Sequence, residues 1–157
     1  MSIQTPIDSP IEQRNTGKGN PNAILQFERP LNNRQTMLLD LLPGFDSRAT
    51  VRKKDVNMRD LAALTAYTGN EYAVFTKGGE RLVIRGDAYH VEITTEMADE
   101  LAKAGYRWSG HTHPGIDFLS TQPSDGDYAI LGSFKQYRTV IYNASGQMRL
   151  VDRRDME

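Results

Sequence analysis

The chain has 157 residues, of which 38% are hydrophobic and 25% charged, and it contains no cysteine. This length suits one domain with a single core, and this composition excludes collagen-like, wholly disordered and membrane-embedded classes of protein. Without cysteine, a metal ion would be held by histidine and carboxylate side chains, and a covalent nucleophile would be Ser, Thr or Lys.

The charges are nearly balanced, with 19 Lys and Arg against 20 Asp and Glu and a net charge of −1. A protein without a net basic field has little to attract nucleic acid or anionic lipid, so we expect neither as a partner. The sequence contains no signal peptide and no apolar run long enough for a transmembrane segment. The compartment stays open between the cytoplasm and delivery as part of a secreted effector.

The first part of the chain, residues 1–29, is rich in Pro, Gly and Asn, a composition that buries too little apolar surface to fold. Isoleucines recur every fourth residue from Ile3 to Ile11, but Pro6 and Pro10 interrupt that helical spacing. We therefore expect a disordered linker or tail here, as in a module cut from a longer chain.

The remaining residues, 30–157, are expected to form the domain. The paired glycines Gly78 and Gly79 predict a β-hairpin, and the order of elements predicts an α+β domain whose mixed sheet is packed by helices. The predicted elements are helices over 34–42, 57–69, 95–104 and 124–135, and strands over 71–76, 81–85, 91–93, 106–112, 138–142 and 148–151.

The chemistry is concentrated after the strand predicted at 106–112. His111 and His113 stand two residues apart, so a strand would place both imidazoles on one face. Ten residues separate His113 from Ser124, which is expected to begin a helix, and Asp127 follows within its first turn. Two histidines and a carboxylate supply three ligands and leave one position open, which is the coordination of a catalytic zinc site.

These residues also have simpler interpretations. Ser124 and Asp127 have the spacing of a helix capping box, a role that is compatible with a metal site. His90 stands alone and is expected to be structural or exposed. Asp117 and Asp125 are expected to be solvated or to complement a helix dipole.

The motif His111-Thr-His113-Pro114 followed by Ser124-Asp-Gly-Asp127 resembles the JAMM motif of JAB/MPN-domain zinc metalloproteases. The resemblance covers about residues 55–151 and is closest to bacterial MPN-like domains associated with polymorphic toxins and secreted proteins. It implies the MPN fold, a mixed β-sheet flanked by helices. It also implies that residues 30–157 form a zinc metalloprotease domain.

The resemblance assigns a role to each motif position. His111, His113 and Asp127 would bind Zn²⁺, and the Ser124 hydroxyl would help to hold the substrate oxygen. The family's catalytic glutamate lies on an early strand, and Glu71, at 111 − 71 = 40 residues before the first histidine, matches that position. Glu71 would act as the general base.

The loop from Pro114 to Pro123 is longer than is usual in the family. It contains Phe118 and Leu119, which we expect to bind substrate unless they pack inward beside Trp108. The function expected is that of a zinc-dependent metallopeptidase or isopeptidase acting on a peptide or protein, with ubiquitin-like proteins among the candidates. The alternatives are a catalytically silent MPN-like binding module or a delivered bacterial toxin domain, whose partners would include an inhibitor or immunity protein.

Overall fold

The computed structural model describes residues 31–156, so the tail expected at 1–29 lies outside the described residues. The fold is α+β, as predicted, and is built on one six-stranded mixed sheet in the order β2-β4-β3-β5-β6-β7. Strands β5 and β6 are parallel, and all other neighbours are antiparallel. The strands are β2 (Arg48–Arg52), β3 (Tyr72–Lys77), β4 (Glu80–Arg85), β5 (Arg107–His113), β6 (Arg138–Asn143) and β7 (Met148–Asp152).

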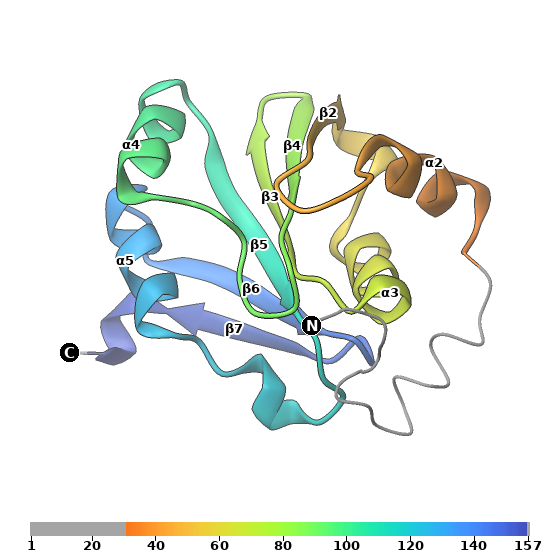
Figure 1. Cartoon of the computed structure of the whole chain (residues 1–157). Helices are drawn as coiled ribbons and strands as arrows, with labels where there is room; N and C mark the ends of the chain where they lie inside the picture. The colour runs from red at the N-terminus through yellow and green to blue at the C-terminus, as the bar shows by residue number, and fades with distance from the viewer. Residues whose placement is uncertain (1–30, 157) are drawn as a thin grey trace.

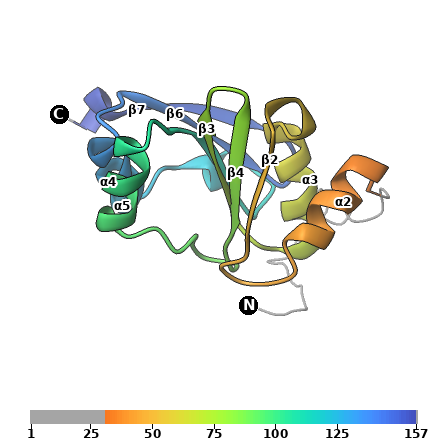
Figure 2. The ribbon, with the colours of Figure 1, turned by 90° about the horizontal axis from the view of Figure 1, so that it is seen from above.

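Two pairs of helices cover the sheet, α2 and α3 on one side and α4 and α5 on the other (Figures 1 and 2). None of the described helices is long and apolar enough to cross a membrane. The α-helices are α2 (Asn33–Leu41), α3 (Met58–Thr68), α4 (Thr95–Lys103) and α5 (Asp125–Ser133), and the 3₁₀ helices are η1 (Lys53–Asp55), η2 (Phe118–Thr121) and η3 (Arg153–Met156).

Strand β3 separates two apolar cores. Successive side chains of a strand point to opposite faces of the sheet. Tyr72 and Val74 accordingly join the core under α2 and α3, and Ala73 and Phe75 join the core under α4 and α5. All four side chains are buried, as expected for a strand inside a sheet that is covered on both faces.

Local signals in the sequence explain most element boundaries. Asn57 caps α3 through a capping box with Asp60, and Gly69 ends that helix at a φ of 77°. Gly78, at a φ of 58°, supplies the positive φ of the turn between β3 and β4, so the predicted hairpin is confirmed.

One predicted strand is absent from the described residues, and one observed strand was not predicted. Residues 91–93 form no strand and lie in the segment between β4 and α4. Strand β2, Arg48–Arg52, was missed because its arginines and its alternating exposure are those of an edge strand rather than an apolar run. Helix η2 was also missed, within the loop predicted at 114–123.

A β-bulge in β5 determines which side chains share a face with the histidines. The pairing of β3 with β5 runs from Ala73↔His111 to Phe75↔Trp108, with the register shifted between Val74 and Phe75. Two residues of β3 therefore span three of β5, which places Trp108 on the same face as His111. Strict alternation along β5 would have placed Trp108 on the opposite face.

Candidate functional site

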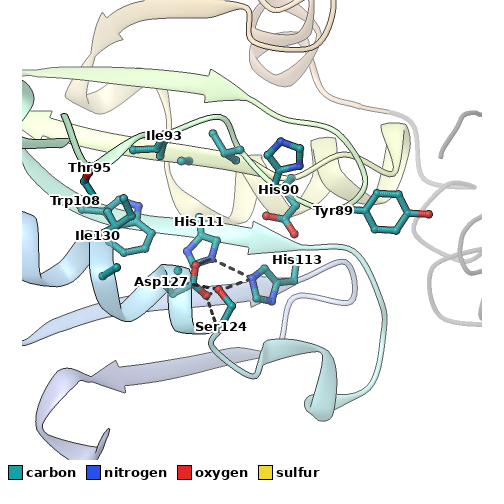
Figure 3. A pocket seen from close by; sticks show the side chains of 15 residues that line it. Tyr89, His90, Ile93, Thr95, Trp108, His111, His113, Ser124, Asp127 and Ile130 are labelled. Carbon is teal, nitrogen blue, oxygen red and sulfur yellow. Dashed lines mark hydrogen bonds and ion pairs between the residues drawn. The ribbon is translucent and has the colours of Figure 1, made fainter. Parts of the chain in front are cut away.

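The two histidines lie at the end of β5 and converge, as their spacing predicted. The Nε2 atoms of His111 and His113 are 3.0 Å apart, and the two rings meet edge to face (Figure 3). At this separation the two nitrogens can share a proton or face a common ion. His111 is buried and His113 is nearly so.

Asp127 approaches the same point from the first turn of α5. Its Oδ1 atom lies 3.3 Å from His111 Nε2, and its Oδ2 atom lies 3.8 Å from His113 Nε2. The Ser124 N–H donates to Asp127 Oδ2 at 2.9 Å, and the Ser124 hydroxyl oxygen accepts from the Asp127 N–H at 3.1 Å. The capping box is thus formed and directs the carboxylate toward the histidines.

Glu71 lies immediately before β3 and brings a second carboxylate to the histidines. Its side chain is only 8% exposed. One carboxylate oxygen lies within 4.8 Å of a ring nitrogen of each histidine, and the group Glu71, His111 and His113 could hold a metal ion. The histidines therefore have two carboxylate neighbours, Asp127 from α5 and Glu71 from the start of β3.

The two imidazoles differ in what supports them. His113 Nδ1 lies 2.9 Å from the Ser120 carbonyl oxygen, and a proton held there leaves Nε2 free to bind a metal. Two buried side-chain nitrogens, His111 Nδ1 and Trp108 Nε1, have no hydrogen-bond partner among the described residues. The Trp108 and His111 rings stack with their centroids 5.0 Å apart.

The electrostatics of the site set different protonation preferences for its members. Burial raises the pKa of Glu71 well above its usual range, and the charges of Asp127 and Asp87 raise it further. Burial and the neighbouring His111 lower the pKa of His113 to about 4, against the opposing effects of Asp127 and the Ser120 carbonyl. At neutral pH His113 is therefore in the uncharged form that binds metals.

Asp127 stays ionised in spite of its burial. Burial by itself would raise its pKa, but the charge and hydrogen bond of His111 and the backbone hydrogen bond from Ser124 outweigh that effect and lower the pKa to about 2. An anionic carboxylate beside two imidazole nitrogens is a donor set suited to a divalent cation.

No family model, curated protein or solved structure matches the chain. The function is therefore inferred from the geometry of these side chains and from the cavity around them.

The site opens into a cavity of about 340 Å³. Sequence reasoning had placed Glu71, His111, His113, Ser124 and Asp127 in one site, and all five line this cavity. The other walls were not predicted, because nothing in the sequence shows that the segment 86–94 and α5 line one cavity or that β5 carries a bulge. The further lining residues are Ala73, Tyr89, His90, Val91, Ile93, Thr95, Trp108, Gly126, Ala129 and Ile130.

His90 is exposed, as expected, but it also lines the cavity. Its Nδ1 and Nε2 atoms each lie 3.2 Å from a carboxylate oxygen, of Asp87 and Glu92 respectively. Its ring also meets Phe45 edge to face, at 5.6 Å between centroids. These contacts place an imidazole on the cavity wall, outside the convergence point of the other two histidines.

The structure does not bring Phe118 and Leu119 into the cavity. They lie on η2 and are 47% and 71% exposed, so neither packs inward beside Trp108. The Arg149 guanidinium lies 4.1 Å from the centroid of the Phe118 ring. Asp117 caps η2 by accepting from the Ser120 N–H. A role of Phe118 and Leu119 in substrate binding stays a prediction.

Proposed function

We propose that this domain is a zinc-dependent peptidase or isopeptidase. The observation that carries the proposal is the convergence of His111 Nε2, His113 Nε2 and the Asp127 carboxylate, with separations of 3.0, 3.3 and 3.8 Å, beside a second buried carboxylate. A binding surface without catalysis has no need of this donor set together with a further acid–base group.

The donor set fits zinc. Zinc binds imidazole nitrogen and carboxylate oxygen at about 2.0–2.2 Å, which puts the ligands of a tetrahedral ion roughly 3.3 Å apart. The three separations lie around that value, and three protein ligands leave one position open. When bound, zinc would polarise a substrate carbonyl and lower the pKa of a coordinated water toward about 7.

The two carboxylates take different roles in this proposal. Asp127 is the third ligand because it lies within 3.3 and 3.8 Å of the two histidine nitrogens and is directed there by the cap at Ser124. Glu71, whose carboxylate also reaches both histidines, is the general base. Its carboxylate removes a proton from the attacking water as the new C–O bond forms.

Glu71 then passes that proton to the leaving amine nitrogen as the C–N bond breaks, so it serves as base and then as acid. The Ser124 hydroxyl oxygen accepts from the Asp127 N–H, and its own proton remains free to donate to the substrate oxygen. Glu71 therefore carries out the proton transfers, and the Ser124 hydroxyl contributes a hydrogen bond to the substrate oxygen.

We infer membership of the JAB/MPN family from the motif resemblance, and the observed α+β fold with its mixed sheet is compatible with it. A peptide or protein is the corresponding substrate. Delivery as a toxin domain, with a cognate inhibitor or immunity protein, would be a biological role for the same activity. A silent binding module is the less favoured alternative, since Glu71, His111, His113, Ser124 and Asp127 all line one cavity.

The test is metal content followed by cleavage. Protein purified from cells supplied with zinc should carry about one zinc per chain, measured by mass spectrometry of the metal. His113→Ala should lose most of it, whereas the control His90→Ala, outside the convergence point, should keep it. The zinc-loaded chain should cleave members of a proteome-derived peptide library, and chelation should stop the cleavage. Wild-type protein without stoichiometric zinc would overturn the proposal.

A further inference from the structure

One wall of the cavity is the segment between β4 and α4, residues 86–94. Gly86 and Asp87 form backbone hydrogen bonds with Glu71, the proposed base. The Gly86 N–H donates to the Glu71 carbonyl at 2.7 Å, and the Glu71 N–H donates to the Asp87 carbonyl at 2.8 Å. The Asp87 carboxylate accepts from the Tyr89 and His90 N–H groups. The start of the segment is therefore held in one conformation next to Glu71.

Gly86 shows how closely this segment folds back. A Cβ atom at Gly86 would lie 2.1 Å from the His90 carbonyl oxygen, so no other residue fits without moving the backbone. Val91 and Ile93 follow this turn, and both line the cavity while packing against the core under α4 and α5. The wall is thus supported from behind by the core.

The cavity has two chemically different ends. Figure 3 shows Ile93, Trp108 and Ile130 on one side of the site, away from His113 and Ser124, with Thr95 as the one polar side chain labelled beside them. Trp108 and Ile130 come from β5 and α5 and are 3% and 9% exposed, so they belong to the core as well as to the cavity. The stacking of Trp108 on His111 joins this apolar end directly to the proposed metal site.

We propose that this apolar end is a specificity pocket that takes a bulky apolar side chain on the residue next to the scissile bond, an inference that rests on the proposed function. The cavity volume of about 340 Å³ is at the lower end of the range for small-molecule sites, about 300–1,000 Å³. It has room for a large side chain beside the reacting group. An apolar substrate side chain would pack against Ile93, Trp108 and Ile130 and remove their apolar surface from water.

The charges around the cavity disfavour both acidic and basic substrate side chains at the apolar end. No Lys or Arg is among the described residues that line the cavity, so an acidic side chain would find no cation there. Its two carboxylates, Glu71 and Asp127, both lie beside the histidines, so a basic side chain at the apolar end would be buried without a counter-charge.

The test uses amino-acid hydroxamates, which chelate zinc through a common group and differ only in the side chain. Leucine hydroxamate, glycine hydroxamate and aspartate α-hydroxamate are titrated into the zinc-loaded full chain by calorimetry. Trp108, the single tryptophan of the chain, gives a second readout by fluorescence. The leucine probe should bind about tenfold to a hundredfold more tightly than the glycine probe, and the aspartate probe no more tightly than glycine.

A pair of variants locates the effect. Ile93→Ser should lower the preference for leucine over glycine about fivefold or more, with affinity for glycine hydroxamate unchanged. Leu150→Ser is the matched control, because Leu150 is an exposed residue of β7 that does not line the cavity, and it should change neither affinity.

The outcomes separate the two proposals. Glycine hydroxamate binding without a leucine preference, or a preference that survives Ile93→Ser, would overturn the specificity pocket and leave the metal site standing. Absence of zinc from the wild-type chain would overturn the proposed function, and the specificity pocket with it.

Discussion

The two faces of the sheet differ in how completely they are filled. Under α2 and α3, large side chains such as Leu61, Leu64 and Tyr72 are fully buried. Under α4 and α5, the core is interrupted at one end by the cavity that contains His111 and Asp127. We call the first the closed face and the second the open face.

Buried polar groups follow the same division. On the closed face, Thr112 is completely buried, and its hydroxyl bonds to Thr65 of α3 and accepts from the Tyr72 N–H. On the open face lie Trp108 Nε1 and His111 Nδ1, the two buried side-chain atoms without partners among the described residues. Unpaired buried polar atoms are rare and costly, so their location on the open face supports the proposed site there.

The largest effect, on the rate of cleavage, is expected from replacing Glu71 on the open face. Glu71→Gln preserves the shape of the side chain but cannot accept the proton, so cleavage should fall about 10²-fold to 10⁴-fold. Zinc content and melting temperature should stay at wild-type values. The measurement is the cleavage rate of a substrate from the peptide screen, alongside metal analysis.

The exposed Glu80, at the start of β4, supplies the control: Glu80→Gln should cleave normally. A Glu71→Gln protein that lost its zinc would show that Glu71 is a ligand, as the group Glu71, His111 and His113 also permits. Full activity in that variant would exclude Glu71 as the base.

On the closed face, a substitution should lower stability without changing zinc binding. Leu61→Ala leaves a cavity in a fully buried region and should lower the free energy of unfolding by about 2–5 kcal/mol. The folded fraction should still bind zinc at wild-type stoichiometry. Tyr67→Ala on the same helix is the control, since Tyr67 is 52% exposed and should change stability by about 0.5 kcal/mol or less. Denaturant unfolding measures both, and a loss of zinc from folded Leu61→Ala would contradict the division between the faces.

The sequence predicted the features that depend on local signals. The caps at Asn57 and Ser124, the hairpin turn at Gly78 and the positions of the histidines each depend on a few adjacent residues. The convergence of His111, His113 and Asp127 was likewise expected from strand periodicity and a helix start.

The missed features depend on interactions between distant parts of the chain. The bulge that puts Trp108 beside His111 arises from the pairing of β3 with β5, and a period-2 pattern predicts the opposite face. The position of Ile93 depends on the turn at Gly86, where the chain approaches the His90 backbone. No periodic pattern in the sequence predicts such a turn. The residues that converge at the candidate site were therefore predictable, whereas the cavity walls were not.

A smaller effect, on zinc affinity, is expected from replacing Asn143, the last residue of β6. Its completely buried amide donates to the Asp117 carbonyl and to the Ser120 hydroxyl, and the Ser120 carbonyl faces His113 Nδ1. Asn143→Ala should loosen this support and weaken zinc affinity about tenfold, in the range found for residues that orient metal ligands.

Competition with a chelator of known affinity measures that change. Gln147→Ala is the control, because Gln147 belongs to the same turn and its side chain accepts from the Asn143 amide, while the Asn143 bonds to Asp117 and Ser120 stay in place. Unchanged zinc affinity in folded Asn143→Ala would show that the Ser120 carbonyl does not depend on this anchor.

The smallest effect on stability is expected at Phe118 and Leu119. Both side chains are largely exposed on η2, and a double Phe118→Ala and Leu119→Ala variant chiefly removes the interaction of the Arg149 guanidinium with the Phe118 ring. A cation–π interaction at an exposed site contributes about 0.5–1 kcal/mol, so the melting temperature should fall only slightly and zinc content should not change. If these residues bind a protein substrate, the same variant should weaken its binding while hydroxamate affinities stay constant, because neither residue lines the cavity. A large fall in melting temperature with protein binding intact would instead make η2 part of the support of the open face.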